Sequence, residues 1–359
     1  MFNINDIARQ VLQNCTISDA NNAGMYSICG LALRLRDLYK WEQGLPPWEE
    51  RDSTEVLEWI ESKENQWEKC IDSEFANITI NDKSYDPFDI AGINAFLEPQ
   101  NFFYGAGYGR SLKPTFFLAA VKEKSTINGT TVYTLSRELA RDLLTIPALS
   151  QEDQVIVRQD SAKFYLWDNI FYIKKSSRPA LNFALRSCGI KDHQPKALRH
   201  RLADILAAQQ ETYIYHEIGE LRDTVFNREL WREIIAAFPF SPVEFLARAV
   251  KDLLADTNEH GTLQQIVRQR NTAALAFYVA FLDGLPKEFF PQLPASFQQF
   301  IRKQDWRIID EAVSDGFRTA AQNAALIMDI YQDGFEKKDL KWAAEQIQKR
   351  LLGRYMKKK

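Results

Sequence analysis

Two histidines in the C-terminal half of the chain each have a carboxylate four residues away. His216 precedes Glu220 in the segment YHEIGE, and Asp256 precedes His260 in ADTNEHG. A spacing of four places two side chains on one side of an α-helix, close enough to share an ion. If the two helices pack together, two imidazoles and two carboxylates converge, a set that suits iron, manganese or zinc. The sequence therefore predicts a divalent metal site formed by His216, Glu220, Asp256 and His260.

A structural explanation of the same residues stays open. His260 stands directly before a glycine, and a histidine at a helix C-terminus interacts favourably with the helix dipole. His216 and Glu220 could lie on a solvated helix face. Arg270 falls on the apolar side of the next predicted helix and would need an acid if buried, and Asp256 or Glu220 could supply it.

A second candidate site is the glycine-rich segment YGAGYGRSLK. Gly105, Gly107 and Gly109 could expose backbone N–H groups, and Arg110 and Lys113 would add the positive charge that a phosphate or carboxylate requires. The segment matches neither the phosphate loop GxxxxGK[ST] nor the dinucleotide fingerprint, so its specificity for anions is low. A glycine-rich turn that packs its tyrosines against the core is the alternative.

The helices that must position the histidines are indicated by periodicity and caps. The helix around YHEIGE has an apolar stripe on one side and polar residues on the other, which predicts a central helix buried on both faces. The next helix begins at Ser241-Pro242-Val243-Glu244, an N-cap serine, a proline at the first position and a capping-box glutamate. Its expected apolar stripe is Val243, Leu246, Val250, Leu253 and Leu254.

Helical patterns dominate the chain, and one β signal interrupts them. Alternating apolar residues flank Asn128-Gly129, which is typical of a β-hairpin turn. The sequence therefore predicts a mainly α fold, a multi-helix bundle with one small β-hairpin near residues 115–135. We expect a mostly helical N-terminal region with the hairpin over residues 1–190 and a C-terminal helical bundle over residues 191–359. One continuous domain is the alternative.

Composition restricts the class of protein. With 359 residues, 45% of them hydrophobic and 26% charged, the chain can bury a large core. A net charge of -3 provides no basic field, so we expect no nucleic-acid partner. The four cysteines have no disulfide or zinc spacing, which favours reduced thiols. No apolar run approaches the roughly 18 residues of a membrane span and no signal peptide is visible, so we expect a cytoplasmic protein away from membranes.

Several segments resemble a family of uncharacterised bacterial proteins of similar length. They are YKWEQGLPPW, YGAGYGR, YHEIGE and DTNEHG, together with the residues around them. The resemblance covers most of the chain and implies a bacterial, cytoplasmic origin. It supplies no catalytic residue and no activity.

Two functional hypotheses follow from the residues. The first is a metal-binding helical protein, a metal-dependent oxidoreductase or hydrolase in which the ion activates water or dioxygen. The second is a non-enzymatic structural or protein–protein interaction protein whose polar clusters hold its helices in register. Its partner would be another protein or a second copy of the chain.

Overall fold

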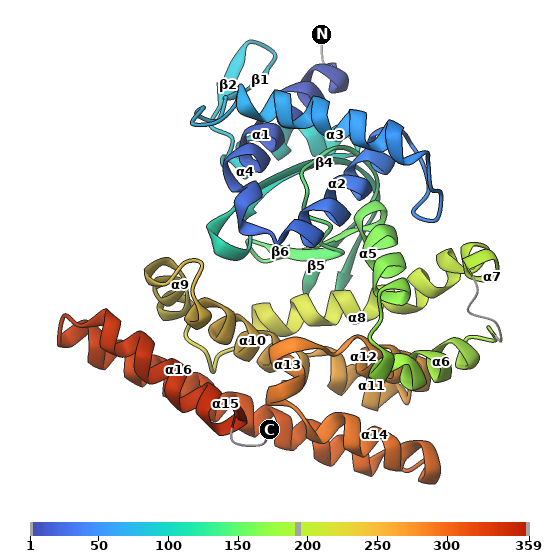
Figure 1. Ribbon diagram of the computed structural model, residues 1–359, viewed down its shortest axis with the longest axis vertical. Coiled ribbons are helices and arrows are strands. Elements are labelled where there is room, and N and C mark those ends of the chain that lie inside the picture. The colour runs from blue at the N-terminus through green and yellow to red at the C-terminus, as the bar shows by residue number, and fades with distance from the viewer. Residues whose placement is uncertain (1–2, 191–194, 357–359) are drawn as a thin grey trace. The chain divides into compact units, whose positions relative to one another are not determined.

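The computed structural model describes residues 3–190 and 195–356, and the chain divides into two compact units (Figure 1). Unit 1 comprises Met1–Asp168 and unit 2 comprises Asn169–Lys359. The boundary expected from the sequence, between residues 190 and 191, adjoins residues 191–194, which lie outside the described residues. Within the described part, no helix has the length and apolar character needed to cross a bilayer.

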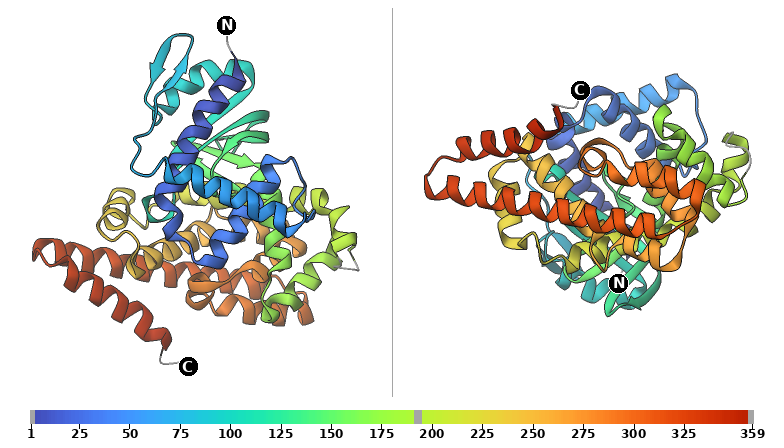
Figure 2. Two further views of the ribbon diagram at one scale, coloured as in Figure 1. Left: turned by 45° about the horizontal axis from the view of Figure 1, so that its top comes forward. Right: turned by 90° about the horizontal axis from the view of Figure 1, so that it is seen from below.

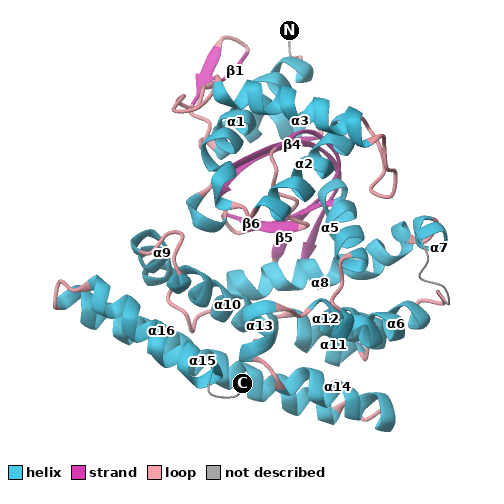
Figure 3. Cartoon of the chain, viewed as in Figure 1, coloured by secondary structure: helices cyan, strands magenta, loops and turns pink. Residues whose placement is uncertain are grey.

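A curled five-stranded sheet forms the centre of unit 1 (Figure 3). Its strands in spatial order are β3 (Phe102–Tyr108), β4 (Pro114–Ile127), β5 (Thr130–Arg141), β7 (Gln154–Arg158) and β6 (Ala148–Gln151). Neighbours are antiparallel except β5 and β7, which are parallel. A separate antiparallel pair consists of β1 (Ile78–Ile80) and β2 (Lys83–Tyr85). Unit 1 is therefore a mixed α and β structure.

The expectation of a mainly α bundle with one small hairpin near residues 115–135 is wrong. Asn128 and Gly129 do form a turn with positive φ angles of 50° and 78°, but the strands they join are the centre of a larger sheet. Both faces of this sheet are buried: Phe116 lies in a cluster on one face and Phe117 in a cluster on the other. A strand covered on both faces lacks the alternation of polar and apolar residues that reveals a half-buried strand.

Helices cover the sheet of unit 1. On one face, Ile7, Val11 and Cys15 of the first helix meet Phe116 and Leu118 of β4. The helices are α1 (Ile4–Asn22), α2 (Ile28–Glu42), α3 (Ser53–Glu68), α4 (Ile90–Leu97) and α5 (Gln159–Phe171), the last of which runs across the boundary between the units. Helix α1 thus covers one face of the sheet, whereas the cluster on the other face, which includes Phe117, is formed by residues of the strands themselves.

All regular elements described in unit 2 after α5 are helical. They are α6 (Arg178–Ser187), α7 (Pro195–Arg199), α8 (Leu202–Arg222), α9 (Arg228–Ala237), α10 (Pro242–Thr257), α11 (Thr262–Gln269), α12 (Thr272–Phe281), α13 (Gly284–Phe289), α14 (Gln292–Lys303), α15 (Arg307–Glu336) and α16 (Leu340–Met356), with a short 3₁₀ turn at Lys175–Ser177. The long helices α15 and α16 form a hairpin whose two arms diverge from the connecting turn (Figure 2).

The expected start and apolar stripe of α10 are confirmed. The Ser241 hydroxyl accepts a hydrogen bond from the Glu244 backbone at 3.3 Å, and Glu244 in turn accepts one from the Phe240 backbone at 3.0 Å. All five residues of the expected stripe are buried. The helix ends at Thr257, so His260 lies three residues beyond its last residue.

Candidate functional site

Two helices of unit 2, α8 and α10, meet at very short range. A Cβ atom at Gly219 of α8 would lie 2.0 Å from the carbonyl oxygen of Ala255. Just beyond α10, the Asn258 amide donates a 2.8 Å hydrogen bond to the Gly219 carbonyl. The glycine in YHEIGE therefore sets the separation of the two helices that carry the candidate residues.

His216, Asp256 and Tyr278 form a hydrogen-bonded chain across three helices. His216 Nδ1 on α8 donates to Asp256 Oδ1 on α10 at 2.8 Å, and Tyr278 Oη on α12 donates to Asp256 Oδ2 at 2.7 Å. The side chain of Asp256 is 13% exposed and that of His216 is 29% exposed. Among the described residues, none forms a hydrogen bond with His216 Nε2. This nitrogen is therefore the end of the hydrogen-bonded chain that can bind a ligand.

The surrounding charges favour a protonated His216. Burial alone would lower the pKa of His216, but the charge of Asp256 and its hydrogen bond outweigh burial and hold the pKa well above its usual value. Burial, reinforced by Asp256, raises the pKa of Tyr278, so the phenol remains a neutral donor. At neutral pH the chain consists of an imidazolium, a carboxylate and a phenol.

Glu220 is held by a different cation. It forms an ion pair with Lys251 of α10, whose Nζ lies 3.8 Å from the centre of the Trp231 ring. Burial would raise the pKa of Glu220, but Lys251 lowers it, so the carboxylate stays ionised and neutralised. Asp252 lies beside this pair; burial raises its pKa to about 6, against the opposing charge of His216.

His260 lies at the surface, away from the hydrogen-bonded chain. Its side chain is 43% exposed, and its Nε2 is 3.6 Å from Glu259 Oε1. It lines a cleft of about 410 Å³ together with Asp223 and Phe317, and neither His216 nor Asp256 lines this cleft. Two of the four predicted ligands, His216 and Asp256, are therefore the ones in direct contact.

The structure does not bring the four predicted metal ligands together as one group. In the part of the chain that the structure describes, no group of three or more His, Cys, Asp or Glu side chains is arranged to hold a metal ion. Two physical reasons account for this. Lys251 neutralises Glu220, and α10 ends at Thr257, so His260 does not continue the helix face that carries Asp256.

Sequence reasoning missed Tyr278, the second partner of Asp256. Tyr278 is the one residue with a polar side chain between Ala273 and Phe281, and an isolated hydroxyl in an apolar helix needs a partner when buried. That signal could have identified it. Arg270, the expected alternative partner, is exposed at the end of α11 with a positive φ of 52°.

The predicted anion-binding segment is largely a strand. Gly105 and Gly107 belong to β3, whereas Gly109 precedes a short 3₁₀ turn that begins at Arg110. A Cβ atom at Gly105 would lie 2.1 Å from the Phe117 ring, so the glycine makes room for an aromatic side chain of β4. Close packing, and not exposure of backbone N–H groups, accounts for this glycine.

Lys113, the cation of that segment, is neutralised inside unit 1. Its Nζ lies 3.0 Å from Asp19 Oδ1 and 3.1 Å from Asp142 Oδ2, and the lysine side chain is fully buried. Burial raises the pKa of Asp19 to about 6 although Lys113 acts in the opposite direction. Lys113 is therefore committed to two internal carboxylates and not presented to an external anion.

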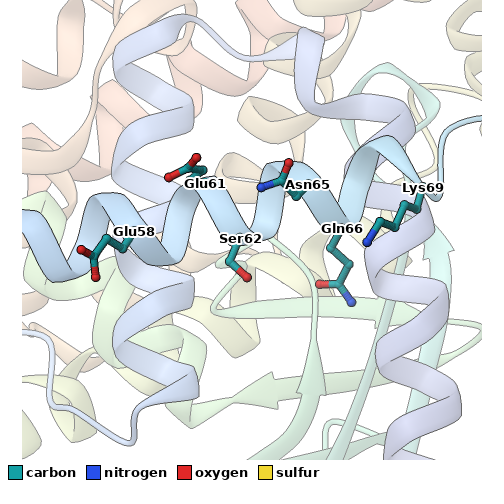
Figure 4. Close-up of a pocket in the computed structure, with 6 residues that line it drawn as sticks. All are labelled: Glu58, Glu61, Ser62, Asn65, Gln66 and Lys69. Atoms are coloured by element: carbon teal, nitrogen blue, oxygen red, sulfur yellow. The ribbon is translucent and has the colours of Figure 1, made fainter.

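A shallow hollow of about 620 Å³ runs along α3 (Figure 4). It is lined by six polar residues of this one helix, Glu58, Glu61, Ser62, Asn65, Gln66 and Lys69. Ligand sites usually combine apolar walls with a few convergent polar groups, and these side chains follow the length of the helix instead. We assign no function to this hollow.

Comparison with known proteins gives a family without an activity. The model of the N-terminal domain of the family of unknown function DUF6866 matches residues 6–158, and the model of its C-terminal domain matches residues 163–350. No curated protein and no solved structure matches the chain. The expected resemblance to an uncharacterised family is thereby confirmed, and the chain belongs to the DUF6866 family of unknown function.

Proposed function

We propose that unit 2 carries an acid–base site in which His216 exchanges a proton with a bound substrate. The observation that supports this proposal is the chain from Tyr278 through Asp256 to a partly exposed imidazole. A carboxylate on Nδ1 fixes the ring and its tautomer and leaves Nε2 as the working nitrogen. Asp256 is a positioning residue, and Tyr278 holds the second oxygen of Asp256.

The raised pKa gives His216 the role of a general acid at neutral pH. Its Nε2–H would donate to an oxygen or nitrogen atom of the substrate, and Asp256 would stabilise the imidazolium before transfer. The charges of Glu217 and Asp252 also favour the imidazolium. Carboxylates around the ring repel anions, so the proposed substrate is neutral or cationic at the point of proton transfer.

A non-enzymatic role as a helix clamp is the second candidate. Other contacts between helices in this region are also single hydrogen bonds: Thr262 Oγ1 donates to the Thr212 carbonyl at 2.9 Å, and Asn258 donates to Gly219. A set of such bonds specifies one register of packed helices. In this role the chain from His216 to Tyr278 would stabilise unit 2 and transfer no proton to a ligand.

Three variants distinguish the two roles: His216→Gln, Asp256→Asn and, as a matched control, His260→Gln. The histidine pKa values are measured by NMR titration of the imidazole Cε1–H resonances. Turnover is measured with a panel of neutral and cationic p-nitrophenyl esters and anilides. The acid–base role predicts a His216 pKa well above ~6.5 that falls in Asp256→Asn, and turnover lost in His216→Gln but kept in His260→Gln.

The clamp predicts a different result. Asp256→Asn and His216→Gln would then lower the free energy of unfolding in urea, and the wild-type protein would give no turnover above the His216→Gln background. A His216 pKa that is unchanged in Asp256→Asn would contradict both roles, because each depends on the bond between these two side chains.

A further inference from the structure

Two buried arginines in unit 1 have unused hydrogen-bond donors. Arg141 ends β5 and Arg158 ends β7, and each is 1% exposed. Nη1 and Nη2 of Arg141 and Nη2 of Arg158 are buried and have no hydrogen-bond partner among the residues that the structure describes. Buried polar groups are almost always paired, and an unpaired cationic donor is the costliest exception. The arrangement therefore indicates an acceptor that is not supplied by the chain.

The protein acceptors near these arginines are already committed. Glu138 Oε1 accepts from Arg158 Nε at 2.7 Å, and both oxygens of Glu138 accept from the Ser161 hydroxyl at 2.9 and 3.0 Å. Its Oε2 is 3.8 Å from Arg141 Nη1, too far for a hydrogen bond. Asp142 acts on Arg141 through its charge, but its carboxylate is bonded to Lys113 and to the Leu144 backbone.

Aromatic rings hold both guanidinium groups. Arg141 Cζ lies 5.9 Å from the centre of the Trp41 ring and 5.7 Å from that of Phe164. Arg158 Cζ lies 4.3 Å from the centre of the Phe117 ring, the ring for which Gly105 makes room. Such contacts hold the guanidinium groups by their charge and do not satisfy the unpartnered N–H groups, which still require an acceptor.

We infer that Arg141 and Arg158 form an internal binding site for a small two-oxygen anion, a carboxylate or a phosphate. Two terminal nitrogens of one guanidinium match two oxygens of such a group in the bidentate geometry that arginine favours. This site is distinct from the His216 site and does not depend on it.

Binding is tested with acetate and with inorganic phosphate on protein purified in a buffer that contains neither. After overnight equilibration, the Arg Nε–Hε resonances and Tm are followed during titration. The expected result is a saturable shift confined to the signals of Arg141 and Arg158, with a Tm that rises with ligand concentration. Saturation by acetate alone assigns a carboxylate, and saturation by phosphate alone assigns a phosphate.

Arg141→Lys keeps the positive charge and removes the pair of guanidinium N–H donors that could bind two oxygens. Arg9→Lys at the surface is the matched control. Arg9 is 77% exposed and pairs with Asp6. We expect Arg141→Lys to abolish the anion-dependent rise in Tm and Arg9→Lys to retain it. If Arg141→Lys does not fold, the wild-type NMR titration still decides. The inference is overturned if neither anion gives a saturable shift, because the donors then bind only water.

Discussion

Replacing Gly219 by alanine tests whether the close approach of α8 and α10 organises the His216 site. The added Cβ would lie 2.0 Å from the Ala255 carbonyl oxygen and 3.1 Å from Gly261 Cα. An ordinary contact between nonbonded heavy atoms is about 3.5 Å. The helices must therefore separate by roughly an ångström or more, since the atoms in the way are backbone atoms that cannot rotate aside.

The expected cost follows from three contributions. Overpacking that shifts the backbone costs about 1–3 kcal/mol, and two opposed backbones place this case at the upper end. Stretching the hydrogen bond from Asn258 to the Gly219 carbonyl removes about 1 kcal/mol more. The higher helix propensity of alanine stabilises the folded state by about 1 kcal/mol. We therefore expect Gly219→Ala to lower the free energy of unfolding by about 3 kcal/mol.

Gly353→Ala is the matched control, because Gly353 lies in α16 with nothing within 4 Å of an added Cβ. It should gain about 0.5–1 kcal/mol from helix propensity alone. Both variants are measured by urea unfolding followed by circular dichroism, and the pKa of His216 is measured by NMR. Two results would refute the idea that the separation of α8 and α10 organises the His216 site. One is a free energy of unfolding of Gly219→Ala equal to that of Gly353→Ala. The other is a lower stability of Gly219→Ala with the pKa of His216 unchanged from the wild type.

Three further predictions concern buried charge. Asp252→Asn should raise the free energy of unfolding by about 1–2 kcal/mol at pH 8 and leave it nearly unchanged at pH 4. The pKa of Asp252 is raised to about 6 in the folded protein, so its ionisation opposes folding as pH rises through that value; equal effects at both pH values in urea titrations would contradict this reasoning. Asp256→Asn should lower the free energy of unfolding more at pH 6 than at pH 10. The pKa of His216 is raised in the folded protein, so its stabilising effect is complete below the pKa of the unfolded state and is lost as pH rises through the folded-state pKa. A loss of stability that is larger at pH 10 than at pH 6 in the same assay would contradict this reasoning. Lys113→Met should lower the free energy of unfolding by about 3–5 kcal/mol at pH 8. The loss should be smaller at pH 5, because the two aspartates that the substitution leaves unpaired can then take up protons. A difference in Tm from the wild type that does not change with pH would argue against the buried ion pairs.

The helices of unit 2 were largely predictable because their signals are local. The residues Ser241 to Glu244 contain both halves of the N-terminal cap of α10, and the stripe that follows has the helical period. Such elements are determined by residues within a few positions of one another, so periodicity and capping suffice.

The sheet of unit 1 depends on contacts between distant residues. The strand β3 contains Gly105 and Gly107, and glycines at this density are typical of a loop. The structure instead shows that Phe117 of the neighbouring strand packs over Gly105. Leu135 in β5 pairs with Arg158 in β7 in parallel, and no local turn sequence predicts a parallel pairing of this kind. Burial on both faces weakens alternation as well, so beyond the hairpin at Asn128-Gly129 neither periodicity nor turn chemistry separates these strands from helices.

The candidate site shows why spacing within a helix does not identify a shared ligand. A separation of four puts His216 and Glu220 on one side of α8, but each finds its partner on α10: Asp256 for the histidine and Lys251 for the glutamate. The choice depends on which residues of α10 lie opposite at the separation that Gly219 permits. The imidazole and the carboxylate, one turn apart on α8, are thus each neutralised by an opposite charge on the facing helix, and spacing along α8 alone does not reveal those partners.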